Sequence, residues 1–186
     1  MHDEMAGSSK AQRQAAGRRK RLVMTNRMSY HCKIFCENKG KRNEMRRIFR
    51  TQARVAFADT DAMGVVYHAS YLRWFENGRS ELLREMGFPY TELEKKPVWM
   101  PLVHASMDYK KSARYDDLIE VVTQFSEVGQ ASLIMSYEIY NKETGDLLVT
   151  GCTRHGMTDD KMKPISVKKA YPEFYAAMRE ALGDED

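Results

Sequence analysis

The stretch DTDAMGVVYHASYLRWFE, which runs from Asp59 to Glu76, decides the fold of this 186-residue chain. Its first half is a short acidic loop with one glycine. Its second half opens a segment, residues 68–86, in which apolar residues recur at helical spacing. Charged residues occupy the opposite side, and the apolar stripe consists of Tyr71, Phe75, Gly78, Leu82 and Met86. The stretch therefore predicts a tight polar loop that leads into one long amphipathic helix.

Alternating residues on both sides of this helix predict β-strands. Before the loop, apolar or small residues occupy every second position, namely Phe49, Thr51, Ala53, Val55 and Phe57. After the helix, a period of two runs from Val103 to Tyr109, and three further strand-like segments follow at 118–125, 133–140 and 147–157. Turn residues between these last three predict antiparallel hairpins, and Pro172 opens a short C-terminal helix.

This order of elements restricts the architecture to an α+β domain. One long helix cannot bury its own stripe, so it must pack on one face of an antiparallel five-stranded sheet. A single helix also leaves sheet edges and surface uncovered. Pairing with a second copy of the chain is therefore expected.

The net charge of +4 is distributed unevenly along the chain. Residues 1–44 contain 11 Lys and Arg against 4 Asp and Glu, whereas residues 45–186 contain 19 against 22. We therefore expect a basic N-terminal extension, 1–44, and a globular domain, 45–186. A disordered tail, or a translation start assigned too early, is favoured for the extension over a targeting peptide or an arm for nucleic acid or anionic membranes. No nucleic-acid partner is expected.

The sequence favours a cytoplasmic protein without a metal. It has no apolar stretch near the roughly 18 residues that a transmembrane segment needs, and no apolar signal segment. Its three cysteines cannot form an even disulfide framework, which favours a reducing compartment. His31, Cys32 and Cys36 are not followed by a second ligand pair at zinc spacing, so we expect no metal site.

Familiar catalytic signatures such as G-x-S-x-G, the P-loop, G-x-G-x-x-G and H-E-x-x-H are absent from the sequence. What remains is the loop from Asp59 to His68 at the start of the long helix. The unpaired N–H groups of a helix N-terminus could stabilise an oxyanion, and a carboxylate just upstream could attack a carbonyl or activate a water. Helix capping and turn formation explain the same residue types equally well.

The stretch from Asp59 to Glu76 resembles the signature D-T-D-x-x-G-V-V-Y-H-x-x-Y of the hot-dog-fold 4-hydroxybenzoyl-CoA thioesterase family, in its YbgC-like, Tol-Pal-associated branch. The resemblance covers about residues 46–180 and includes SARYDD at 112–117. It implies a hot-dog fold, in which the sheet wraps around the central helix. It also implies an acyl-CoA thioesterase without a cofactor, assembled as a homodimer or homotetramer with the site between subunits.

The resemblance also assigns roles to individual residues. Asp61 matches the essential carboxylate, which acts as nucleophile or general base. His68 matches the position whose backbone N–H points at the thioester oxygen, and its imidazole is linked to activity. Asp59 corresponds to a loop-stabilising acceptor. The residues that shape the oxyanion loop are Gly64, Val65 and Tyr67.

Several assignments stay open at this point. Glu76 matches the carboxylate of another hot-dog branch, but Asp61 already fills that role, so we expect an exposed helical residue. The basic residues Lys110, Lys111 and Arg114 are candidates for the coenzyme A phosphates or for solvated charge.

The segment 128–131, where some relatives bind the nucleotide, is uncharged. An acyl-carrier-protein substrate therefore remains an alternative, as does a non-catalytic module that binds thioesters. Trp99, Met100 and Met107 are candidates either for the acyl pocket or for the core.

Overall fold

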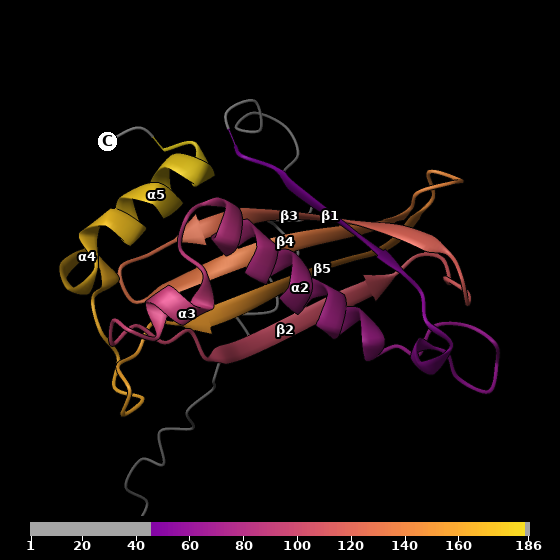
Figure 1. Ribbon diagram of the computed structural model, residues 1–186, viewed down its shortest axis with the longest axis horizontal. Helices are drawn as coiled ribbons and strands as arrows, with labels where there is room; N and C mark the ends of the chain where they lie inside the picture. Colours follow the sequence, from indigo (N-terminus) through magenta and orange to yellow (C-terminus); the bar gives the residue numbers. More distant parts are fainter. Residues whose placement is uncertain (1–45, 185–186) are drawn as a thin grey trace, which may run out of the picture.

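The computed structural model describes residues 46–184 and contains one antiparallel five-stranded sheet. The strands lie in the order β1-β3-β4-β5-β2, so the first two strands of the chain form the two edges (Figure 1). The strands are β1 (Phe49–Arg54), β2 (Leu102–Tyr109), β3 (Leu118–Val128), β4 (Ser132–Asn141) and β5 (Leu147–Gly156). The predicted α+β class and hairpin succession are confirmed.

One long helix, α2 (Ser70–Glu85), crosses one face of the sheet diagonally (Figure 1). It buries most of the predicted stripe, and Gly78 lets it approach β3 closely. A Cβ at Gly78 would lie 2.4 Å from Thr123 Oγ1 and 3.2 Å from Val121 Cγ1. Trp74 is also buried, although the apolar stripe predicted from the sequence did not include it.

The shorter helices are η1 (Phe57–Asp59), α3 (Tyr90–Leu93), α4 (Val167–Ala170) and α5 (Pro172–Leu182). The last two lie at the end of the sheet where α2 finishes, and η1 lies at the other end (Figure 1). Phe88, which follows α2, packs its ring 5.1 Å from that of Phe174 on α5. The predicted C-terminal helix from Pro172 is therefore present and closes this end of the core.

The centre of the core is a stack of two aromatic rings. Phe75 of α2 lies 4.2 Å from Tyr137 of β4, with an angle of 9° between the ring planes. Gly151 of β5 supplies the room, since a Cβ there would lie 2.6 Å from Phe75 Cε2. The stack thus fixes how α2 lies across β4 and β5.

Two predicted boundaries are wrong. Phe57 is not on the buried face but is 78% exposed, because the strand alternation ends at Val55 and the chain turns into η1. The helix begins at Ser70 rather than His68, since His68 and Ala69 form a turn before it. Both errors place loop residues inside a regular element.

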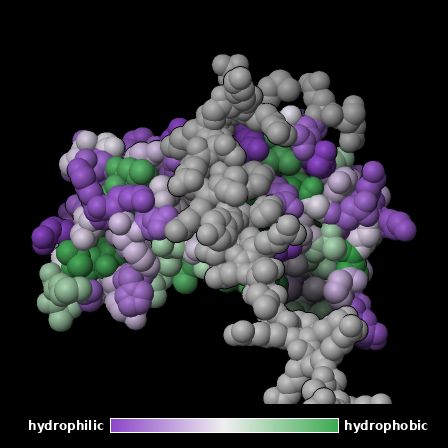
Figure 2. All heavy atoms as spheres, turned by 180° about the vertical axis from the view of Figure 1, so that it is seen from behind, coloured by the Kyte–Doolittle hydropathy of each residue, from purple (hydrophilic) through white to green (hydrophobic). Residues whose placement is uncertain are grey.

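The N-terminal extension, 1–44, lies outside the described residues, as do Met45, Glu185 and Asp186. On the described surface seen from behind, hydrophobic residues form separate groups among hydrophilic ones (Figure 2). Within residues 46–184 no helix has both the length and the apolarity to cross a bilayer. Cys152 is buried on β5.

Candidate active site

The acidic loop holds Asp61 in a tight turn. Its N–H donates to the carbonyl of Val65 at 2.9 Å, and its own carbonyl accepts from the N–H of Gly64 at 2.9 Å. The carboxylate oxygen Oδ1 accepts the N–H of Met63 at 2.8 Å. Gly64 has φ +72°, a backbone conformation that favours glycine at this turn. Asp61 is therefore fixed through Oδ1, while Oδ2 has no hydrogen-bond partner within the described range.

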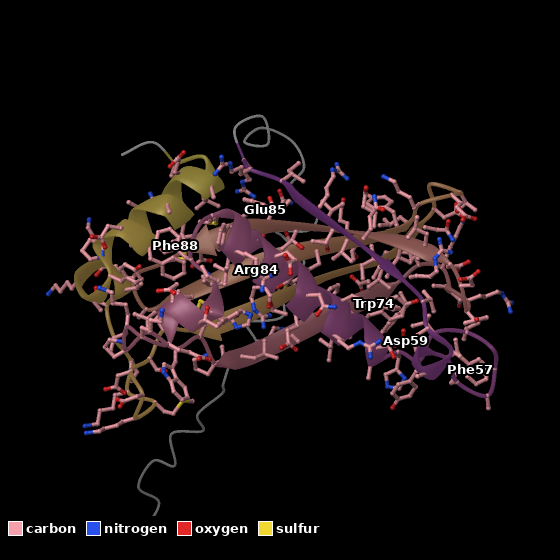
Figure 3. The ribbon with its side chains drawn as sticks, in the orientation of Figure 1. Phe57, Asp59, Trp74, Arg84, Glu85 and Phe88 are labelled. Carbon is pink, nitrogen blue, oxygen red and sulfur yellow. The ribbon has the colours of Figure 1, made fainter. Side chains whose placement is uncertain are left out.

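Asp59 ties this loop to the helix. It is 2% exposed, and its carboxylate accepts the N–H of Ala56 at 3.0 Å and forms an ion pair with Arg73 of α2. Its carbonyl accepts from the N–H of Tyr67 at 2.8 Å and from the hydroxyl of Ser70 at 3.2 Å. Figure 3 shows Asp59 beside the start of α2, with Phe57 farther out. This bonding suits the loop-stabilising role that the resemblance implies.

Two backbone N–H groups are available just before α2. The N–H of Ser70 donates to Tyr67 and that of Leu72 to Ala69, but those of His68 and Ala69 donate to no acceptor within residues 46–184. The residue before the helix, Ala69, has no side chain that could cap it. This turn therefore offers a pair of free donors at the positive end of the helix dipole.

The side chain of His68 is exposed and packs against the neighbouring ring of Tyr67, with 4.2 Å between centroids. Its carbonyl accepts the hydroxyl of Tyr109 at 3.1 Å, which joins the turn to edge strand β2. No hydrogen bond joins His68 to Asp61 among the described residues. The structure thus brings both residues to one loop but does not pair them.

The second motif, 112–117, packs against the acidic loop. The N–H of Val66 donates to the carbonyl of Ala113 at 2.9 Å, and the N–H of Ala113 donates to the hydroxyl of Tyr71 at 3.4 Å. A Cβ at Gly64 would lie 4.0 Å from Arg114 Nη1, so the guanidinium stands beside the turn that holds Asp61. Arg114 is therefore a basic group at the loop.

The other two basic candidates, Lys111 and Lys110, differ from Arg114 in their contacts. The ammonium of Lys111 pairs with Asp146 in the turn between β4 and β5. Lys110 follows β2 and is exposed. The uncharged turn 128–131 lies at the far end of the sheet, where the carbonyl of Gln130 accepts the N–H of Val167. Within the described part of the chain, no group of three or more His, Cys, Asp or Glu could hold a metal ion.

Sequence reasoning missed two residues that complete this site. Arg73 was placed only on the polar side of the helix, and its pairing with Asp59 depends on how the loop folds back. Tyr109 was recognised as a strand residue. Its position on the same face as Met107 was a usable signal, because alternate strand residues point to the same side.

Comparison with known proteins identifies the family. Residues 55–182 match the family described as the thioesterase-like superfamily. The chain is 36% identical over 135 residues to YneP of Bacillus subtilis, covering 72% of this chain and 97% of YneP. It is 34% identical over 123 residues to the acyl-CoA thioester hydrolase YbgC of Escherichia coli, covering 66% and 92%.

Solved structures agree with this match. The DHNA-CoA thioesterase of Staphylococcus aureus superposes with a TM-score of 0.67 at 33% identity, covering 70% of this chain and 87% of that one. A thioesterase structure from Bartonella henselae gives 0.60 at 36% identity, covering 64% and 98%. The chain belongs to the thioesterase-like superfamily, which confirms the hot-dog fold and the class of thioester hydrolase that its sequence indicated.

Proposed function

We propose that this protein hydrolyses an acyl-CoA thioester to a free acid and coenzyme A. The observation that carries the proposal is the loop before α2. It sets the unpartnered Oδ2 of Asp61 in the same short turn as the free N–H groups of His68 and Ala69. A nucleophile or base and an oxyanion site are what acyl transfer requires. The activity named for YbgC supports coenzyme A as the leaving group.

In the proposed reaction the thioester oxygen lies against the two free N–H groups. Oδ2 of Asp61 removes a proton from water, the water oxygen bonds to the carbonyl carbon, and the two N–H groups stabilise the negative oxygen. Collapse of this intermediate breaks the C–S bond, and the thiolate takes the proton from Asp61. Direct attack by Oδ2, followed by hydrolysis of the acyl-enzyme, uses the same groups.

Three features shape the substrate site in this proposal. Gly64, Val65 and Tyr67 form the turn that lets the N–H groups converge. Arg114, beside Gly64, is positioned to contact a coenzyme A phosphate, because a guanidinium binds phosphate with two parallel hydrogen bonds. Lys110 is a second candidate, and Lys111 would first have to leave Asp146.

We also propose that the active protein is a homodimer, or a homotetramer built from such dimers. Edge strand β2 leaves one side unpaired within residues 46–184. Its start is apolar and open, with Leu102 53% and Val103 56% exposed. Tyr109 of the same strand bonds the turn at His68, so pairing along β2 would place a second subunit beside the site.

The test is Asp61→Asn, assayed by thiol release from a panel of acyl-CoAs. Because general-base or nucleophilic groups contribute about 10²–10⁴-fold, kcat should fall by at least about a hundredfold while the melting temperature stays close to that of the wild type. Asp160→Asn, a substitution at an exposed aspartate after β5, is the matched control and should leave kcat unchanged. Near-normal turnover by Asp61→Asn would overturn the assignment, and a wild type inactive on every thioester would favour a non-catalytic binding module.

A further inference from the structure

A second cluster of polar side chains lies between α2, α3 and β5, away from the acidic loop. Arg79 of α2 donates from Nε to the hydroxyl of Tyr90 on α3 at 2.6 Å. Its Nη1 lies 3.4 Å from Nε2 of His155, a β5 residue that is 1% exposed. Three elements that are distant in the sequence thus converge on one guanidinium.

The cluster continues inward as a connected network. Nε2 of His155 lies 3.0 Å from the hydroxyl of Thr153, and the Thr153 hydroxyl lies 2.9 Å from that of Tyr137. Nδ1 of His155 lies 3.1 Å from the carbonyl of Met100. Both Thr153 and Tyr137 are buried. These inner groups satisfy one another and hold the guanidinium in place.

Among the residues that the structure describes, Arg79 is a cation without a carboxylate partner. None of the ion pairs among residues 46–184 includes it, and its hydrogen-bonding partners are neutral. His155 is one of them, because burial first and the neighbouring Arg79 second lower its pKa to about 4. A half-buried cation with neutral neighbours is destabilising unless an anion approaches it. The hydroxyl of Tyr137 is a third neutral partner, so three of the five N–H donors of the guanidinium are used and two are left for a further acceptor.

A strip of apolar side chains connects this cluster with the acidic loop. On β2 the residues facing α2 are Tyr109, Met107 and Ala105, paired in turn with Val149, Gly151 and Thr153 of β5. The strip begins at Tyr109, whose hydroxyl bonds the carbonyl of His68, and ends opposite Thr153 of the cluster. Helix α2 packs mainly on β3 and β1, so this side of the sheet is only partly covered.

The two ends of the strip are separated by the length of a medium acyl chain. Arg79 follows Ser70 by nine residues, about 14 Å along the helix axis at 1.5 Å per residue. On the strand, the four residues from Tyr109 to Ala105 span about 13 Å. Helical side chains lean toward the N-terminus, which brings the guanidinium somewhat closer to the loop.

We propose that Arg79 is a specificity-determining residue that binds a carboxylate at the far end of the acyl chain, so that the preferred substrates are ω-carboxyacyl thioesters of medium length. This inference rests on the proposed function. The thioester lies at the loop, the methylene chain lies along the strip of Tyr109, Met107 and Ala105, and the terminal carboxylate accepts hydrogen bonds from Arg79.

The test compares sebacoyl-CoA with decanoyl-CoA, which has the same chain length but a methyl end. Wild-type kcat/KM should be at least about tenfold higher for sebacoyl-CoA, the range of one charge-assisted hydrogen-bonded pair. In Arg79→Gln this ratio should fall to near one, and Arg79→Lys should retain part of it. Arg84→Gln, on the next turn of α2 and exposed, is the matched control and should keep the wild-type ratio (Figure 3).

The outcomes separate this inference from the proposed function. If the wild type hydrolyses sebacoyl-CoA and decanoyl-CoA with equal kcat/KM, or if Arg79→Gln lowers kcat/KM for both substrates by the same factor, Arg79 has only a structural role and the inference is wrong. If neither substrate nor any other thioester is hydrolysed, the proposed function itself fails. If Arg79→Gln does not fold, the test uses the wild-type protein alone, and its hydrolysis rate is measured on a series of substrates from succinyl-CoA to dodecanedioyl-CoA. A rate that does not rise once the chain can span the strip overturns the inference.

Discussion

Replacing Gly151 by alanine tests whether the aromatic stack at the centre of the core determines stability. A Cβ at this position would lie 2.6 Å from Cε2 and 2.7 Å from Cζ of Phe75, and 2.7 Å from the backbone carbonyl oxygen of Ser106. Carbon atoms in contact are normally about 3.5–4.0 Å apart, so the neighbours must move by roughly 1 Å. The ring is stacked on Tyr137, and the carbonyl belongs to β2, so neither can move freely.

The expected loss of stability follows from these contacts. Inserting a methyl group into a packed core costs about 1–3 kcal/mol. Removing a glycine from the unfolded chain returns up to about 1 kcal/mol by reducing its entropy. With the carbonyl of Ser106 as an immovable neighbour, we expect Gly151→Ala to lower the free energy of unfolding by about 2 kcal/mol, or roughly 4–8 °C in Tm.

The assay is urea unfolding of Gly151→Ala beside Gly156→Ala, a control in the same strand. At Gly156 an added Cβ would lie 3.8 Å from Val103 Cγ1 and 3.9 Å from Pro101 Cγ, and both distances are ordinary van der Waals contacts. The control should therefore stay within about 0.5 kcal/mol of the wild type. If Gly151→Ala proved as stable as Gly156→Ala, the packing described for Phe75 would be wrong.

Two further predictions concern His155 and the edge strand. The pKa of His155 is about 4 in the folded protein against 6.5 for a free histidine, so the unfolded chain binds the proton first and stability falls as pH drops from 6.5 to 4, by about 3 kcal/mol. His155→Gln should flatten this part of the pH dependence in urea titrations, and an unchanged slope would contradict the assignment. Val103→Lys should weaken pairing along β2, so light scattering should show more monomer and the specific activity should fall; an active monomer would exclude a shared site.

Much of the fold was accessible from residue periodicity. Strand alternation and the helical stripe predicted one long helix and five strands in the correct order, because burial of one face imposes these periods. The pattern gave wrong boundaries at Phe57 and His68, because it continued into residues that form turns in the structure. Their conformation is set by contacts with Asp59 and the 112–117 segment, which a local window does not include.

The site was accessible only in part. The resemblance selected Asp61 and the turn at His68, but residue type alone could not separate catalysis from capping. The cluster around Arg79 could not be predicted, because Tyr90 and His155 come from elements 11 and 76 residues away. Only the packing of α2, α3 and β5 brings these side chains together.

The strand order also has a consequence for how the chain assembles. Strands β3, β4 and β5 are joined by short turns, so their pairing requires the closure of small loops. Strand β1 pairs with β3 through partners such as Ala53 and Ile119, and the loop between them must enclose the whole of α2 and β2. Closing a longer loop costs more chain entropy. Pairing of the two edge strands that flank the acidic loop therefore costs more chain entropy than pairing of the other strands, and the candidate active site lies on these two strands.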